Sequence, residues 1–301
     1  RLTRHVQRTL GAEDAGRKLD EVRAQALAAS FTSYLTVARE AGFSDCTPGR
    51  FLMPGDLAGS PALTFAPLPQ PADTPRGSLW REVAGRYDAY KREVVRPFFR
   101  DHFARIDRQV VLVDALSAIH AGPQAVEDLR RTMAEILMAF RPGRNAFLTS
   151  IFTGQKVEKV LFAATKADHL HHTQHPRLTA IMEAMLRDAK SRADFAGAET
   201  MALSLASLRS TVEETLTRDG ATLNAVRGRL LTGKRATMFP GLLPIDPARL
   251  LSPARQGAEA WLDADYALMG FAPARLTLRP GEGPPHIRLD RAAEFLIGDR
   301  L

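Results

Sequence analysis

The chain has 301 residues, of which 45% are hydrophobic and 25% charged, and these proportions are ordinary for a globular protein. They exclude a disordered chain, a coiled coil and a collagen-like repeat, and no apolar stretch reaches the roughly 20 residues of a membrane-spanning helix. The net charge of +7 comes from Lys and Arg spread along the whole sequence, and Cys46 is the only cysteine, so no internal disulfide can form. We therefore expect a cytoplasmic protein in a reducing compartment.

Residues 1–105 are predicted to form a helical region around an irregular centre. Apolar residues recur near helical spacing over 14–41, and Gly42 stands where a helix C-cap belongs. Seven prolines lie within 43–77, and this density excludes a helix and disfavours a strand.

A second long helix is predicted to begin at Ser78. Ser78 is a candidate N-cap, and Glu82 lies near the position of a capping-box partner. The segment 79–103 is basic and amphipathic, which is compatible with a membrane surface. The simpler interpretation is a helix that packs its apolar face on its own domain.

Beyond residue 105, short apolar runs alternate with helical segments. Segment 106–115 contains the apolar run 110–113, further apolar runs lie at 157–165 and 200–206, and helices are predicted over 123–140 and 176–192. This alternation is typical of a parallel sheet with covering helices, and continuous apolar strands favour a sheet buried on both faces.

The pattern changes to an antiparallel one from Thr211. Residues 222–231 and 235–239 are predicted to form a hairpin that turns at 232–234. Residues 240–286 carry many prolines and little periodicity, so we expect an irregular segment there.

The chain is predicted to end on a short helix. Asp290 is the candidate N-cap, residues 291–297 form the helix, and Gly298 ends it.

A Thr-Lys-x-Asp tetrad, formed by Thr165, Lys166 and Asp168, follows the second apolar run. Ligands of α/β sheets bind at the carboxyl ends of the strands. In G proteins such a tetrad reads guanine, because the Asp carboxylate accepts from the ring N–H and the exocyclic amine while the Lys methylenes lie along the base. Adenine does not offer this pair of donors. The alternative is a polar strand-to-loop junction, since a pattern this short also arises by chance.

The loop after the third apolar run is the second candidate contact with a base. In guanine-binding folds, this loop donates a backbone N–H to the keto oxygen of guanine. Ser207 and Leu208 occupy that place, one helix and one strand after the tetrad. The alternative is an ordinary strand end made of small residues.

A nucleotide site also needs a phosphate-binding loop, and the sequence offers only an imperfect one. Residues 228–235 approach the pattern GxxxxGK[ST], but Arg235 replaces the hydroxyl that binds magnesium. Pro240 and Gly241 prevent a useful helix from following, so no helix N-terminus faces a phosphate. We interpret the segment as a hairpin turn. Asp114 resembles a magnesium-binding carboxylate. In this order of strands, however, it follows the strand that precedes the base-reading one, which is not where the magnesium-binding carboxylate is expected.

Metal and thiol chemistry are not favoured by the sequence. His169, His171, His172 and His175 crowd one loop, and the pair four residues apart, His171 and His175, has the spacing to share a metal on a helical turn. Because Pro176 is expected to begin the next helix and no cysteine is near, we expect no metal site. Cys46 has no neighbour in the sequence that would activate it as a nucleophile.

Five stretches resemble the YcjX family of P-loop GTPase-like proteins. They run from the Pro48–Gly59 segment to the C-terminal helix, and they are residues 48–59, 96–114, 161–169, 174–176 and 285–299. The resemblance covers the chain from about residue 30 to its end. It implies a bacterial stress-associated protein, linked to the phage-shock response, with a guanine-nucleotide site that has Thr165, Lys166 and Asp168 at the base.

The chain departs from that family in one large respect. Members carry a Walker A segment and a D-x-x-G-like segment that would precede everything present here, and the chain does not begin with Met. We therefore expect a fragment that holds the base-recognition half of a GTP/GDP site. Mg²⁺ is expected only with the missing N-terminal segment. Hydrolysis by this chain alone should be negligible, and any catalytic residues would lie upstream of Arg1.

The expected fold is α/β, the distal half of a P-loop NTPase-type parallel sheet with a helical insertion and a small β-containing appendage. The insertion is residues 1–105, the distal nucleotide-binding part 106–215, the appendage 216–286, and 287–301 a helix that packs on the core. The expected ligand is a guanine nucleotide, with an inner-membrane or stress-response protein as a further partner and no specific nucleic acid. The alternative is a non-enzymatic interaction module, with a degenerate nucleotide site, at the inner membrane surface.

Overall fold

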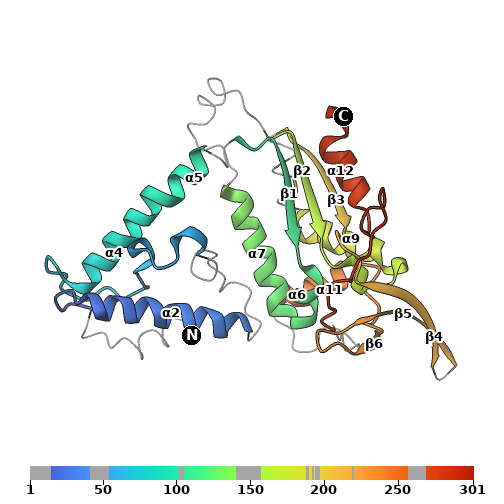
Figure 1. Cartoon of the computed structure of the whole chain (residues 1–301), viewed down its shortest axis with the longest axis horizontal. Helices are drawn as coiled ribbons and strands as arrows, with labels where there is room; N and C mark the ends of the chain where they lie inside the picture. The colour runs from blue at the N-terminus through green and yellow to red at the C-terminus, as the bar shows by residue number, and fades with distance from the viewer. Residues whose placement is uncertain are drawn as a thin grey trace. The chain divides into compact units, whose positions relative to one another are not determined.

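A computed structural model describes residues 15–40, 54–101, 105–139, 157–187, 190–191, 193, 197–218, 220–256 and 269–301. The chain divides into two compact units, residues 1–105 and 106–301 (Figure 1). The candidate site lies in the second unit, so the first is described only briefly.

The first unit is helical. Helix α2 (Glu21–Glu40) begins later than predicted, because residues 15–18 form a turn and a bridge to Ser78, and Asp20 Oδ1 accepts the Val22 N–H at 3.0 Å. The predicted cap Gly42 lies outside the described residues. Described residues of the proline-rich segment form only two 3-10 turns, Gly55–Leu57 and Pro61–Leu63, as its prolines predict.

The predicted second helix is present, with an interruption. It consists of α4 (Leu79–Tyr90), a π-helical turn η4 (Lys91–Val95) and α5 (Arg96–Asp101). Ser78 is the N-cap and accepts from Arg81 N–H, so Arg81 and not Glu82 holds the position of a capping-box partner. Buried side chains from both helices and the irregular segment make the unit's core, namely Ala24, Phe65, Leu79 and Val83.

The second unit contains the predicted parallel sheet. Strands β1 (Arg108–Val113), β2 (Lys159–Ala164) and β3 (Glu199–Ser204) lie in the order β1-β2-β3. The connections are helical, as expected, although α6 (Ala115–Ala121) was not predicted. Helix α7 (Pro123–Ala139) follows it, and α9 (His175–Met185) links β2 to β3 (Figure 1).

Side chains of β2 alternate between two hydrophobic cores, one on each face of the sheet. Val160, Phe162 and Ala164 pack with α6, α7, α9 and α11 (Ala248–Gln256). Leu161 and Ala163 pack with β3 and with α12 (Leu289–Ile297) on the opposite face. The sheet is therefore covered by helices on both faces at its centre, as the apolar runs predict.

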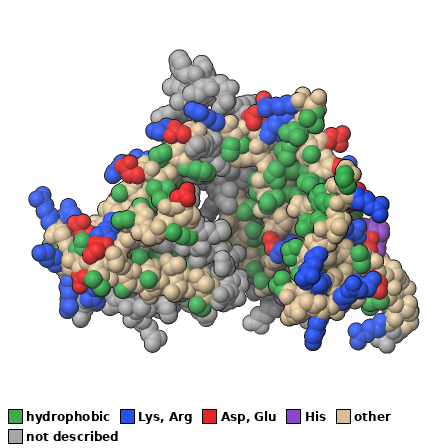
Figure 2. All heavy atoms as spheres, viewed as in Figure 1, with side chains coloured by type: hydrophobic (Ala, Val, Ile, Leu, Met, Phe, Trp, Pro, Cys, Tyr) green, Lys and Arg blue, Asp and Glu red, His purple; other side chains and the backbone are tan. Residues whose placement is uncertain are grey.

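The expectation of burial on both faces is wrong for β1. Val110 is 44% exposed and Leu112 61% exposed, on the face that α12 covers over β2 and β3. Figure 2 shows hydrophobic side chains gathered over β1, β2 and α12 at the upper right of the view. Among the described strands, β1 pairs only with β2, so one backbone edge of β1 has no strand beside it.

The remaining strands form a separate antiparallel sheet. The predicted hairpin is confirmed as β5 (Ala221–Arg229) and β6 (Arg235–Met238), and β4 (Thr211–Arg218) adds a third strand in the order β4-β5-β6. Because β4 begins at Thr211, the expected domain boundary at residue 216 falls inside a strand. Within the expected irregular segment, α11 is a helix.

The C-terminal helix begins earlier than predicted. Arg288, in a left-handed conformation with φ of 57°, is the N-cap of α12, and Asp290 lies inside the first turn. The helix ends at Gly298, as predicted. Asp299 then forms ion pairs with Arg108 and Lys159 at the start of the strands, and the hydrogen bond from Arg108 holds the pKa of Asp299 well below its usual range. These pairs fasten α12 onto the sheet.

Candidate functional site

The carboxyl ends of the three parallel strands meet at one edge of the sheet, where their loops are tied by backbone hydrogen bonds. Thr165 N–H donates to Val113 O at 2.9 Å, and Leu205 N–H donates to Ala164 O at 2.7 Å. Ala167 N–H, inside the tetrad, donates to Leu205 O at 3.2 Å. The tetrad and the loop after β3 are therefore neighbours, as the parallel order requires.

Asp168 is a buried carboxylate, 5% exposed, in a 3-10 turn directly after β2. Its Oδ2 accepts the Ser210 N–H at 2.9 Å, and its main-chain oxygen accepts the Thr211 hydroxyl. In the part of the chain that the structure describes, no group donates to Oδ1. A carboxylate normally satisfies both oxygens when it is buried, so Oδ1 is an acceptor in need of a donor.

Lys166 has the least favourable backbone conformation of the tetrad. Its φ of 60° lies in the left-handed region, which costs a non-glycine residue roughly 1–2 kcal/mol. Its ammonium contacts Asp114 Oδ2 at 2.6 Å and Ser117 Oγ at 3.2 Å. A strained non-glycine residue at a strand end is typical of functional sites, where a side chain must point in one particular direction.

The loop after β3 presents two amide groups. Ala206 and Ile287 exchange two backbone hydrogen bonds, and Arg209 N–H donates to Pro285 O at 2.7 Å, so both ends of the loop are held. Between them, neither the Ser207 N–H nor the Leu208 N–H donates to any described residue. Both are available to an acceptor such as a carbonyl oxygen.

These residues line one cavity of about 740 Å³, which is the size of a typical small-molecule site. Its polar end contains Thr165, Lys166, Asp168, His169, Ser207, Leu208 and Ser210, and Phe271 closes one side. The apolar end runs along Val110 and Leu112 of β1 and the facing side of α12. All five predicted site residues therefore lie together, which the sequence could only suggest.

Two histidines with lowered pKa values lie at the tetrad loop: His169 lines the cavity, and His175 contacts the backbone of the loop. Burial lowers the pKa of His169, whose ring lies edge-on to Phe271 at 5.3 Å between centroids, so a neutral imidazole is favoured. Burial and the charge of Arg288 lower the pKa of His175. Its Nε2 contacts Ala167 O at 2.8 Å and Leu170 O at 3.2 Å, while Arg288 contacts Nδ1 at 3.1 Å. His175 thus fixes the tetrad loop and does not share a metal with His171.

The described residues form neither a phosphate loop nor a magnesium site. The segment 228–235 is the turn between β5 and β6, as predicted, and a Cβ on Gly228 would lie 2.5 Å from the ring of Phe271. Gly228 is thus explained by close packing. Asp114 caps α6 through Ser117 N–H at 3.1 Å and pairs with Lys166, so its two oxygens are already used.

Three residues of the site were not predicted as site residues from the sequence, namely Ser210, Phe271 and His169. Ser210 contributes through its backbone N–H, which any non-proline residue possesses. Phe271 and His169 come together only because the chain returns to the sheet after α11. The one hint was the place of His169 directly after the tetrad.

None of the described helices combines the length and the apolar character needed to cross a membrane.

The comparisons with known proteins give a consistent identification. The chain is 37% identical to the Ras-like GTPase YcjX of Escherichia coli strain K12 in an alignment of 292 positions that covers 94% of this chain and 60% of that protein. It is 30% identical to the Ras-like GTPase YcjX of Shewanella oneidensis in an alignment of 304 positions, gaps included, that covers 97% of this chain and 61% of that protein.

The chain thus spans about three fifths of the length of these curated relatives. The model of the YcjX-like family matches residues 1–301. Both comparisons agree with the resemblance carried by the five sequence stretches, and the chain belongs to the YcjX-like family.

Proposed function

We propose that this chain supplies the guanine-recognition part of a P-loop GTPase. The observation that carries the proposal is the geometry of Asp168. Its carboxylate is buried at the carboxyl end of β2, one oxygen is held by Ser210 N–H, and the other meets no described donor while lining a cavity.

The groups around the cavity are complementary to the edge of guanine. Asp168 offers an acceptor for the ring N–H and the exocyclic amine, and the Ser207 and Leu208 amides offer donors for the keto oxygen. Adenine presents an amine where guanine has its keto oxygen, so the amides would face a donor. The arrangement therefore favours guanine over adenine through unpaired polar groups.

The phosphates and Mg²⁺ would be bound by the part of the relatives' length that this chain does not span. Two features of β1 support this division. One backbone edge of β1 has no described strand beside it, and this edge, with the exposed Val110 and Leu112, is suited to a further strand and helix packed against the sheet. GTP hydrolysis, which needs charge stabilisation at the γ-phosphate, then belongs to the extended protein.

The proposal is tested by titrating GTP and ATP into residues 1–301 and into a protein extended to the full length of the relatives. We expect the extended protein to bind GTP well and ATP poorly, and residues 1–301 to bind both very weakly and to hydrolyse neither. Micromolar binding of GTP by residues 1–301 alone would contradict the division of the site. Equal binding of ATP and GTP by the extended protein would contradict guanine recognition. A role in bacterial stress response, and a partner at the inner membrane, are expectations from the family resemblance alone.

A further inference from the structure

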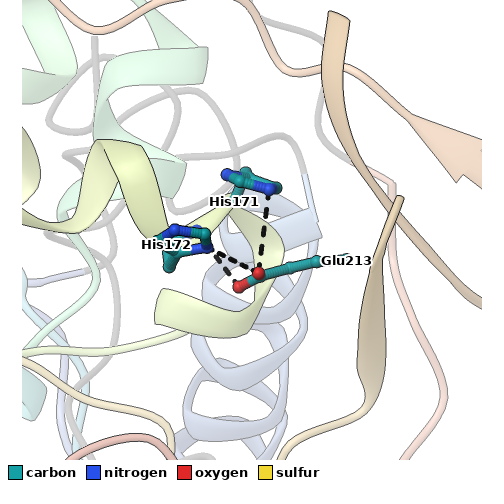
Figure 3. Close-up of side chains that lie close together, drawn as sticks. All are labelled: His171, His172 and Glu213. Atoms are coloured by element: carbon teal, nitrogen blue, oxygen red, sulfur yellow. Dashed lines mark hydrogen bonds and ion pairs between the residues drawn. The ribbon is translucent and has the colours of Figure 1, made fainter. Parts of the chain in front are cut away.

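A second cluster of polar side chains lies on the other side of the tetrad loop. His171 and His172 follow the 3-10 turn that holds Asp168, and Glu213 lies on β4 (Figure 3). The two histidines are adjacent, but Glu213 lies 41 residues after His172, so no sequence spacing marks the three as a set. Figure 3 shows both imidazole rings turned toward the carboxylate of Glu213.

The ligand atoms of the three residues converge. One nitrogen of each histidine and one oxygen of Glu213 all lie within 4.8 Å of one another. His172 Nδ1 is 2.6 Å and His171 Nε2 is 3.7 Å from the same atom, Glu213 Oε2. In a tetrahedral zinc site, neighbouring ligand atoms are about 3.3 Å apart. Adjustments of about an ångström would thus suffice, and His172, whose side chain is 64% exposed, is free to make them.

The second nitrogen of His171 already has a suitable partner. Its Nδ1 lies 3.0 Å from Thr173 Oγ1, which can accept the Nδ1 proton and so leave Nε2 as a lone-pair donor. Histidines that bind metals are usually oriented by such a hydrogen bond from the other ring nitrogen. The weaker contact from Thr173 N–H to Nδ1, at 3.4 Å, would be given up in that tautomer.

We propose that His171 Nε2, His172 Nδ1 and Glu213 Oε2 bind a divalent transition-metal ion of the Zn²⁺ class, with a fourth position open to water. Two imidazoles and one carboxylate favour zinc and its neighbours over Mg²⁺ and Ca²⁺, which prefer oxygen ligands. The ion would replace the direct contacts of the histidines with Glu213.

The two oxygens of Glu213 have different neighbours, and only Oε2 is placed to bind a cation. Arg209 lies 3.4 Å from Oε1, and the His172 N–H donates to the same oxygen at 3.1 Å. Oε2, the oxygen that faces both rings, is the one left for a metal.

A metal at this place would join the tetrad loop to β4. The loop already depends on the start of β4, because Ser210 N–H and Thr211 Oγ1 bind Asp168. An ion held by His171, His172 and Glu213 would add a bond between the same two segments. The inference concerns metal binding by this chain and does not depend on the guanine-binding proposal.

The test is a titration of Zn²⁺ into residues 1–301 carrying Cys46→Ser, which removes the only thiol, in competition with a chromogenic chelator. Co²⁺ replaces Zn²⁺ in a second titration, because its visible absorption reports the ligand geometry. We expect one ion per chain, no competition from Mg²⁺, and at least about tenfold weaker Zn²⁺ binding in His172→Ala and in Glu213→Gln, since loss of even an outer-shell partner typically costs 10- to 100-fold.

His286→Ala is the matched control, because His286 also lies near a carboxylate, 3.9 Å from Asp290. Its Zn²⁺ affinity should equal that of the parent. Hydrogen exchange supplies a second readout: Zn²⁺ should slow exchange over residues 167–175 in the parent and not in His172→Ala. The exposed His172 can be truncated without emptying a core, so the variant keeps the test valid. Unchanged Zn²⁺ affinity in both site variants, or the absence of stoichiometric binding, would overturn the proposal.

Discussion

Replacing Asp168 with Asn changes the group that is proposed to recognise the base while keeping its size. In the structure, the Ser210 N–H donates to Asp168 Oδ2 at 2.9 Å, so only an oxygen is favourable at that position. In Asp168→Asn, the amide oxygen should therefore take the place of Oδ2, and the NH₂ group should take the place of Oδ1. Ser210 thus determines which end of the amide faces the cavity.

The NH₂ group would then meet the donors of guanine. A charge-assisted hydrogen bond is lost and a donor is left opposite a donor, which should cost roughly 2–4 kcal/mol, or about 30- to 1,000-fold in GTP affinity. Xanthine carries a carbonyl in place of the exocyclic amine of guanine, and this carbonyl can accept from the new NH₂. The variant should therefore gain affinity for the xanthine nucleotide, while ATP stays a poor ligand of both proteins.

Competition binding with GTP, XTP and ATP measures all three effects in the extended protein. Asp290→Asn is the matched control: it makes the same chemical change at a side chain that is 70% exposed on α12, and its nucleotide preference should be unchanged. Equal GTP affinity in Asp168→Asn and the parent would show that Asp168 does not contact the base. Thr165–Asp168 would then be a polar strand end held by Ser210 and Thr211.

Two further pairs of variants separate strain and backbone contacts from side-chain chemistry. Lys166→Gly and Lys166→Ala both lose the ion pair to Asp114, so the difference between them reports the backbone alone. If the φ of 60° is strained, urea denaturation should find the glycine variant more stable by about 1 kcal/mol. Equal stability would argue against strain. Ser210→Pro removes the N–H that holds Asp168 and should weaken GTP binding by about 1–3 kcal/mol, whereas Ser210→Ala keeps the N–H and should bind as the parent does. A loss in Ser210→Ala of the same size would show that the hydroxyl matters instead.

The parallel sheet could be predicted from the sequence because its signal is local. Each of the three strands is a short apolar run between helical segments, and a strand followed by a helix and a parallel strand leaves few topologies to choose from. The placement of Asp168 near Ser207 follows from the same rule, because parallel strands end at one edge. What the pattern could not supply was the exposure of Val110 and Leu112, since a run of apolar residues indicates burial without saying what covers it.

The orientation of the tetrad depends on contacts that have no sequence signature. The left-handed Lys166 is not a glycine or an asparagine, so nothing in its identity announces a positive φ. The donor to Asp168 is a backbone group 42 residues away, and His175, which looked like a metal ligand by spacing, is a buried support of the loop. These features arise from tertiary folding, which local patterns do not encode.

The start of β4 connects these observations. A boundary at residue 216 would divide this strand between the nucleotide-binding part and the appendage. Its first residues, with Ser210 just before them, hold Asp168 by two hydrogen bonds, and Glu213 faces the two histidines of the same loop. The antiparallel sheet is therefore not a separable addition, because its first strand orients the carboxylate that is proposed to read the base. We therefore expect a change that shifts β4, whether a mutation in the hairpin or the ion proposed at Glu213, to act on the carboxylate of Asp168 through Ser210.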